Sequence, residues 1–80
     1  MLVKRGGVFY LKILANEYEP KIVMKMIREW TEKTQTEFGN DLGFSKMTIQ
    51  GYERGLRSYT FDTLVKIANA YGLTITIEKR

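Results

Sequence analysis

The stretch from residue 34 to 55 contains a row of polar and basic side chains that have no evident partner elsewhere in the chain. Amides, hydroxyls and ammonium groups of this kind form hydrogen bonds with phosphate oxygens and with the edges of bases. The row therefore points to recognition of a polyanion. Its members are Gln35, Ser45, Lys46, Thr48 and Gln50.

The composition argues against an enzyme and against a metal or cofactor site. The 80-residue chain has no histidine, which is the commonest general base and metal ligand. It has no cysteine either, which removes disulfides and thiolate chemistry together. The acidic residues are scattered and lack the spacing of metal ligands. We expect no catalysis, no cofactor and no metal.

Charge and hydropathy set further bounds. The net charge of +4, with a pI near 9.5, permits a polyanionic partner without demanding one. No apolar run approaches the length that crosses a membrane, and the first residues do not form a signal peptide. We expect a cytoplasmic protein with no membrane partner, folded as one domain over residues 1–80. A core this small often gains stability through oligomerisation.

Apolar periodicity and end signals predict four helices. Thr34, Ser45 and Thr60 can each cap the backbone N–H groups that follow, and Glu37 can complete a capping box with Thr34. Glycines end the last three helices in the left-handed conformation. The helices are expected at residues 21–32, 35–42, 46–54 and 61–71, with Gly43, Gly55 and Gly72 behind the last three.

The expected core follows from apolar residues at helical spacing. Trp30 is left open, since it can either cover the edge of the core or lie in an interface with a partner. The expected core residues are Ile22, Val23, Met26 and Ile27 in the first helix, Phe38, Gly39 and Leu42 in the second, Ile49 and Tyr52 in the third, and Phe61, Leu64, Ile67, Ala68 and Tyr71 in the fourth.

Two short strands flank the helices. Residues 7–14 are rich in β-branched and aromatic residues, and residues 73–79 alternate apolar with polar side chains. A single exposed strand is an aggregation hazard, so each needs a partner. The two strands pair either with each other within one chain or across the two-fold axis of a dimer, and the second arrangement is favoured.

Two helices that meet at a turn around Gly43 form the helix-turn-helix geometry. With Ile49 and Tyr52 buried, the outward face of helix 46–54 holds Lys46, Met47, Gln50 and Gly51. A helix presented in this way fits the major groove of DNA, where residues near its N-terminus reach the base edges.

The stretch "TQTEFGNDLGFSKMTIQGYERG" resembles the helix-turn-helix of the Cro and phage-repressor (xenobiotic response element) family, since its polar, small and apolar positions all agree with that pattern. The resemblance continues through "TFDTLVKIANAYGL" and covers about residues 21–73. It implies a mainly α, lambda-repressor-like domain that binds double-stranded operator DNA as a homodimer.

The resemblance also implies roles for individual residues. Gln35 and Ser45 would contact phosphates, and Lys46, Met47 and Gly51 fall where the family reads bases. The backbone near Arg54 and the Arg57 side chain would hold the sugar–phosphate chain, while Arg28 would pair internally with Glu53. The expected DNA-binding residues are Gln35, Ser45, Lys46, Met47, Thr48, Gln50, Gly51, Arg54 and Arg57.

The chain also departs from the family pattern. Lys33 and Glu32 stand where the family usually has leucine and glycine, and Gly51 offers no side chain to a base. A terminal strand replaces the usual fifth helix and is similar to that of some toxin–antitoxin regulators. The leading hypothesis is a dimeric transcriptional repressor. The alternative is an antitoxin or phage-encoded module that binds and inhibits a protein partner such as a toxin.

Overall fold

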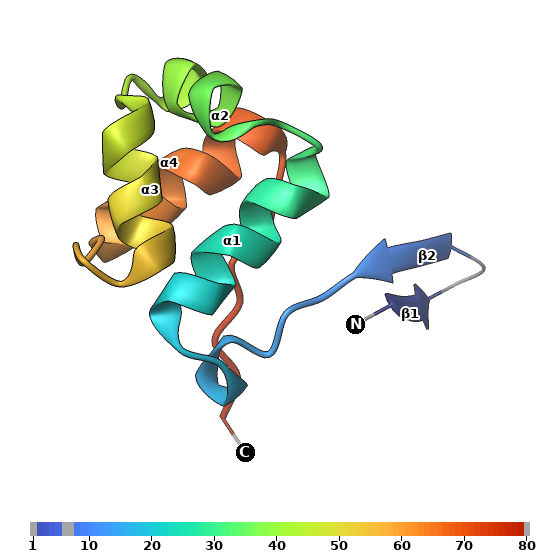
Figure 1. The fold of residues 1–80 in the computed structure, drawn as a ribbon. Helices are drawn as coiled ribbons and strands as arrows, with labels where there is room; N and C mark the ends of the chain where they lie inside the picture. The colour runs from blue at the N-terminus through green and yellow to red at the C-terminus, as the bar shows by residue number, and fades with distance from the viewer. Residues whose placement is uncertain (1, 6–7, 80) are drawn as a thin grey trace.

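Four helices form most of the structure, a computed structural model that describes residues 2–5 and 8–79, with side chains from residue 12 onward (Figure 1). A short 3-10 turn, η1 (Ala15–Glu17), leads into the first helix. The expected mainly α, four-helix class is confirmed. The helices are α1 (Pro20–Thr31), α2 (Gln35–Leu42), α3 (Lys46–Arg54) and α4 (Phe61–Tyr71).

The ends of α2 and α3 are fixed by the expected signals. The Thr34 hydroxyl accepts from the Glu37 backbone N–H at 3.1 Å, and the Glu37 carboxylate accepts from the Thr34 N–H at 2.9 Å. This reciprocal pair is the predicted capping box. Gly43 and Gly55 end α2 and α3 with φ values of 76° and 74°, a conformation in which a Cβ would be strained.

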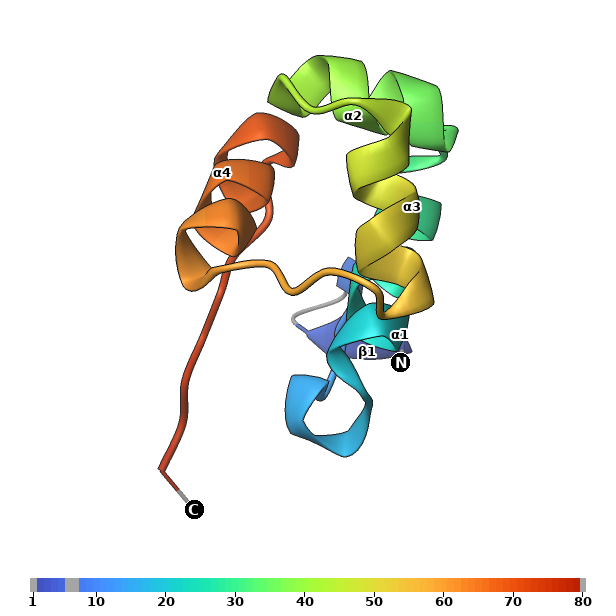
Figure 2. The same ribbon diagram turned by 60° about the vertical axis from the view of Figure 1, so that its left-hand side comes forward.

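The core lies where the four helices meet, and Figure 2 shows α2 lying across the ends of α3 and α4. Six buried side chains form it, with Phe38 from α2 stacked on Tyr71 from α4 at a centroid distance of 5.5 Å. Apolar burial of this kind supplies most of the stability of a small domain. The six are Met24, Phe38, Leu42, Ile49, Tyr52 and Ile67.

Three core predictions are corrected. Met24 is fully buried although it was not expected in the core, and Ile22 is exposed. Phe61 was also expected in the core, yet 57% of its surface is exposed. It occupies the first position of α4, and with about 100° between successive helical residues it lies at the edge of the stripe formed by Ile67, Ala68 and their neighbours.

The N-terminal strand prediction is partly wrong. Residues 7–14 were expected to form one strand, but only Val8–Leu11 (β2) does so, and Gly7 lies outside the described residues. The partner of β2 is β1 (Leu2–Arg5), paired antiparallel with Leu2 opposite Leu11 and Arg5 opposite Val8. The overlooked signal is the Gly6-Gly7 dipeptide between two β-favouring runs, which is typical of a hairpin.

The strand expected at residues 73–79 is not formed within the chain. After α4 the segment continues as an irregular tube (Figures 1 and 2), and the sheet among the described residues contains only β1 and β2. Of the two pairings that the sequence left open, the one between the terminal strands within a single chain is therefore not formed, and the favoured pairing across a dimer axis stays a prediction. Leu73 packs against the core, whereas Ile75 and Ile77 are exposed, the latter by 88%.

Candidate nucleic-acid interface

The turn between α2 and α3 lies directly against α2 because residue 39 is glycine. A Cβ at Gly39 would stand 2.5 Å from the carbonyl oxygen of Phe44, and the Phe44 N–H donates to the Gly39 carbonyl at 2.8 Å. The close approach at Gly39 is to the backbone of the turn, which sets the direction in which α3 leaves it.

The leading end of α3 is exposed, as the helix-turn-helix geometry predicts. Lys46 and Met47 face solvent, and 79% of the Met47 surface is accessible. Ser45 caps the helix by accepting from the Thr48 N–H at 3.1 Å, and the two hydroxyls are 3.0 Å apart. Thr48 therefore belongs to the cap. Its hydroxyl and that of Ser45 remain near the surface, beside the N-terminal N–H groups that favour anions.

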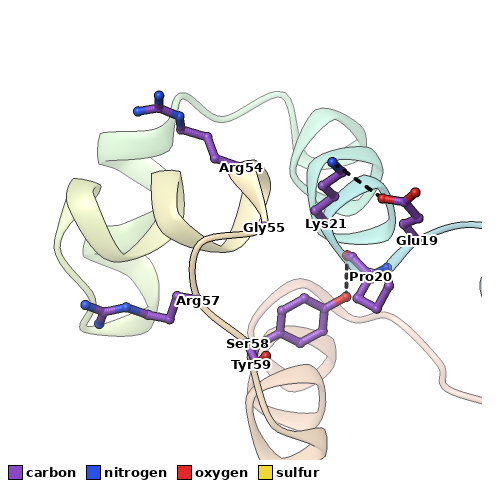
Figure 3. A pocket seen from close by; sticks show the side chains of 8 residues that line it. All are labelled: Glu19, Pro20, Lys21, Arg54, Gly55, Arg57, Ser58 and Tyr59. Carbon is purple, nitrogen blue, oxygen red and sulfur yellow. Dashed lines mark hydrogen bonds and ion pairs between the residues drawn. The ribbon is translucent and has the colours of Figure 1, made fainter.

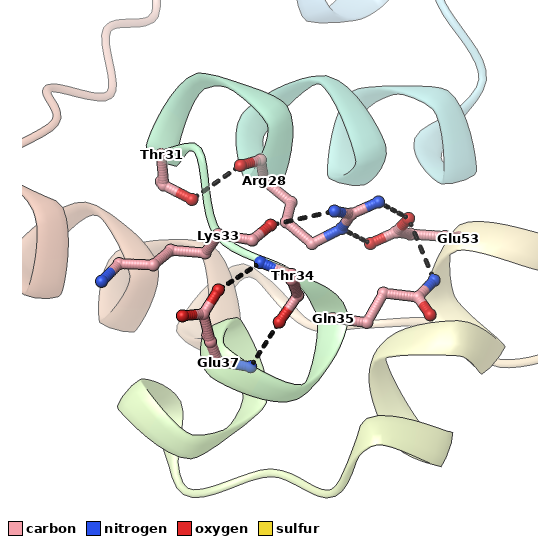
Figure 4. Close-up of polar contacts among 7 residues, drawn as sticks. All are labelled: Arg28, Thr31, Lys33, Thr34, Gln35, Glu37 and Glu53. Atoms are coloured by element: carbon pink, nitrogen blue, oxygen red, sulfur yellow. Dashed lines mark hydrogen bonds and ion pairs between the residues drawn. The ribbon is translucent and has the colours of Figure 1, made fainter.

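A buried ion pair holds α1 and α3 together behind this face (Figure 4). Arg28 donates to both carboxylate oxygens of Glu53, at 2.6 and 2.9 Å, and to the Lys33 carbonyl at 3.0 Å. The two side chains are only 16% and 4% exposed. The hydrogen bonds that Arg28 donates to the Glu53 carboxylate raise the pKa of Arg28, against the opposing effect of burial. The predicted internal pair is present.

Gln35 joins the same network. Its side-chain amide donates to the Glu53 carboxylate at 3.4 Å, so this half-buried side chain is positioned from behind by the ion pair (Figure 4). Sequence reasoning did not identify Glu53 as a partner of Gln35. The separation of 18 residues leaves no periodic signal to find.

A shallow depression of about 420 Å³ lies at the other end of α3, between the start of α1 and the loop that follows α3 (Figure 3). The Lys21 stem passes over Gly55, and the Lys21 ammonium pairs with Glu19 at 3.4 Å. The Tyr59 hydroxyl donates to the Pro20 carbonyl at 2.6 Å, which joins the loop to α1. Sequence reasoning did not single out Lys21. The lining consists of Glu19, Pro20, Lys21, Arg54, Gly55, Arg57, Ser58 and Tyr59.

The predicted residues form one elongated face rather than a pocket. Ser45, Lys46, Met47 and Thr48 lie at its leading end, and half-buried Gln50 and Gly51 lie in the middle of α3. Arg54 and Arg57 are exposed and border the depression. Gln35 lies beside the face, tied to Glu53. With Lys21, the lining of the depression has three cationic side chains, against the single carboxylate of Glu19.

Two further findings concern the described residues as a whole. None of their helices combines the length and the apolar character needed to span a membrane. Within the same residues, no three histidine, cysteine, aspartate or glutamate side chains are grouped so that they could hold a metal ion.

Comparison with known proteins supports this geometry. A helix-turn-helix family model matches residues 24–77. Among solved structures, the HipB chain of a HipB–O1–O2 complex is 27% identical, with a TM-score of 0.58 over 88% of this chain and all of that one. A protein named MDT Protein is also 27% identical, with a TM-score of 0.59 over 88% of this chain and 97% of that one. No curated protein sequence matches. The predicted resemblance is confirmed: the chain belongs to the helix-turn-helix family of DNA-binding regulators.

Proposed function

We propose that the chain is a sequence-specific transcriptional repressor that binds operator DNA as a homodimer, in the cytoplasm, with α3 in the major groove. The observation behind this proposal is the uncovered leading end of α3, with Lys46 and Met47 exposed directly after the Ser45 cap. The first residues of a recognition helix are those that reach the base edges. The Lys46 ammonium suits the acceptors of guanine, and the Met47 thioether suits the methyl group of thymine.

Phosphate contacts complete the proposed interface. The hydroxyl of Ser45 and the amide of Gln35 lie near the N-termini of α3 and α2, where backbone N–H groups favour anions. At the far end of α3, Arg54 and Lys21 border the basic depression. Two phosphate-binding regions on either side of the helix would hold its base-reading face in register.

The dimer is supported by the C-terminal segment. Residues 73–79 have no strand partner among the described residues, and Ile75 and Ile77 are exposed. Pairing of this segment with its copy would satisfy its backbone and cover both isoleucines. Two recognition helices about 34 Å apart could then enter successive major grooves. Size-exclusion chromatography with light scattering tests this, and a monomer at micromolar concentration would end the dimer proposal.

The DNA-binding proposal is tested with Lys46→Ala. Duplexes are selected from a random pool by the unaltered protein, and affinities are then measured by fluorescence anisotropy. Loss of a base contact should weaken binding to the selected site by about 1–3 kcal/mol, with little effect on unrelated DNA. Lys25→Ala is the control, because Lys25 is exposed on α1 and its loss removes the same charge. Equal losses in both variants would contradict base reading by Lys46.

A second function is favoured by the likeness to HipB and by the resemblance of the terminal segment to toxin–antitoxin regulators. In this alternative the chain is an antitoxin, or a phage-encoded inhibitor, that binds a protein partner. The backbone of residues 73–79 and the hairpin β1–β2 would provide strand edges for such a contact, and the exposed isoleucines would add apolar surface to it. A toxin-like reading frame next to the gene, and stoichiometric recovery of its product with this chain, would support it. DNA binding and toxin binding are compatible.

A further inference from the structure

The outward face of α3 has a gap at Gly51, and the side chain of Arg57 lies over it. A Cβ built on Gly51 would be 3.3 Å from the Cβ of Arg57, 3.9 Å from its Cδ and 3.8 Å from its Nε. The Arg57 stem is thus in contact with the helix where position 51 would otherwise bear its own side chain. Gly51 is one helical turn after Met47, on the face assigned to the major groove.

The local backbone explains this placement. After Gly55 ends α3, the N–H groups of Leu56 and Arg57 both donate to the Gly51 carbonyl, at 3.0 and 3.2 Å. The chain therefore folds back over the last turn of the helix, and the hydrogen bond from Tyr59 to Pro20 holds the other end of the loop. In Figure 3, Arg57 runs back alongside α3, whereas Arg54 extends from the end of α3 in a different direction.

We propose that Arg57 is a specificity-determining residue that presents its guanidinium to a guanine in the major groove. In this way it supplies the base-reading group that Gly51, which has no side chain, cannot provide. This inference rests on the proposed function. A guanidinium can donate two parallel hydrogen bonds to O6 and N7 of guanine, which is the commonest specific contact in protein–DNA complexes. Among the described residues, the exposed Arg57 guanidinium has no hydrogen-bond or ion-pair partner that would hold it away from DNA.

Because of this close contact, the placement of the Arg57 side chain depends on glycine at position 51. A Cβ at 3.3 Å from the Arg57 Cβ is tighter than ordinary van der Waals contact, so Gly51→Ala must shift the arginine stem. That variant retains every charge of the protein, and alanine favours helix formation over glycine. It therefore separates the position of the guanidinium from its charge.

The experiment compares Arg57→Lys, Arg57→Ala and Gly51→Ala with the unaltered protein on the selected duplex and on all its single base-pair substitutions. We expect Arg57→Lys to retain affinity for unrelated DNA but to lose about tenfold discrimination at one G·C pair in each half-site, since lysine lacks the planar fork. Gly51→Ala should lose discrimination at the same pair. Arg57→Ala should lose it as well, together with some affinity for all DNA. Lys25→Ala removes an exposed charge on α1, away from the proposed interface, and as the charge control it should preserve discrimination at every pair.

Two results would overturn the inference. One is unchanged discrimination by Arg57→Lys at every pair; the other is an equal loss by Arg57→Ala on all duplexes, which would make Arg57 a phosphate contact. Circular dichroism melts establish that each variant is folded before its affinity is compared. Failure of the unaltered protein to select any consensus would overturn the proposed function itself, and with it this inference. Selection of a consensus that Arg57 does not influence would overturn only the inference.

Discussion

Glu32, at the end of α1, is the only non-glycine residue with a positive φ, 58°, among those the structure describes. Its position is equivalent to that of Gly43 and Gly55 at the ends of α2 and α3. A Cβ in this conformation approaches the neighbouring carbonyl and costs about 1 kcal/mol. The sequence showed the departure from the family pattern, and the structure shows that the helix ends in the same way without the glycine.

Glu32→Gly should therefore stabilise the protein. We expect the free energy of unfolding to rise by about 0.5–1 kcal/mol, because glycine adopts this conformation without strain. Urea denaturation measures this gain, which should appear as a higher midpoint concentration of urea. The slope of the unfolding free energy against urea concentration should stay unchanged. Glu29→Gly, in the interior of α1, is the control and should destabilise. A lower midpoint for Glu32→Gly would show that the Glu32 side chain contributes more than its backbone strain costs.

The ion pair between Arg28 and Glu53 shows what residue patterns can and cannot predict. The pair itself was predicted, because the family resemblance relates two residues that are 25 positions apart. Its other partners, the Lys33 carbonyl and the Gln35 amide, were not. Contacts of this kind depend on the angle between helices, and no periodicity within a single helix encodes that angle.

Arg28→Ala should destabilise the protein strongly, by about 3 kcal/mol, because the 4% exposed Glu53 carboxylate would lose its counter-charge. Thermal and urea unfolding measure the loss. The double variant Arg28→Ala/Glu53→Gln has no uncompensated charge at this site, so it should recover part of the stability that Arg28→Ala loses. A double variant that is no more stable than Arg28→Ala would argue against the buried charge as the cause.

At the scale of elements, the capping box at the start of α2 links structure to pH. Hydrogen bonds from the Thr34 backbone N–H and then from its hydroxyl lower the pKa of Glu37 from its ordinary value near 4.5. A carboxyl group whose pKa is lower in the folded state adds stability above its unfolded pKa. That contribution is lost as the pH falls through the folded value.

The stability difference between the unaltered protein and Glu37→Gln should accordingly depend on pH. It should favour the unaltered protein at about pH 7 and shrink at about pH 2, where a protonated carboxyl resembles an amide. Urea midpoints at a series of pH values measure it. Glu78→Gln, in the exposed C-terminal segment, is the charge control. A difference that does not change with pH would argue against the ionised carboxylate as the stabilising group.

The helices were predictable and the strands were not, for a physical reason. A helix satisfies its backbone within a continuous segment, so local signals such as Thr34, Ser45 and the terminal glycines determine its bounds. A strand is defined by a partner, and residues 73–79 have the right alternation but no partner in the described part of the chain. For β2 the partner was β1, a segment that sequence reasoning did not assign.

At the scale of the whole molecule, the fold places cationic side chains near both ends of α3. Lys46 lies at the leading end of α3, while Arg54 and Lys21 lie at the other end. This distribution could not be derived from the net charge of +4, because the excess is spread evenly along the sequence. The fold determines which few of these charges share a surface.

DNA affinity should therefore fall steeply with salt. Each phosphate contact adds about 0.9 to the slope of log K against log salt concentration, so Arg54→Ala should reduce that slope by about 1 if Arg54 contacts a phosphate. Fluorescence anisotropy across a potassium chloride series measures it. Lys25→Ala should leave the slope nearly unchanged. An affinity for DNA that does not respond to salt would exclude backbone contacts as the main source of binding.

The hydrogen bond between Tyr59 and Pro20 joins residues that are 39 positions apart, and it anchors the loop that includes Arg57 to the start of α1. A loop held in this way has already lost most of its conformational freedom before any ligand arrives, so ordering it on a target costs little further entropy. Calorimetry of Tyr59→Phe should therefore show a less favourable entropy of association than that of the unaltered protein. Tyr59 thus affects recognition without contacting DNA, because its hydrogen bond limits the motion of the loop that carries Arg57.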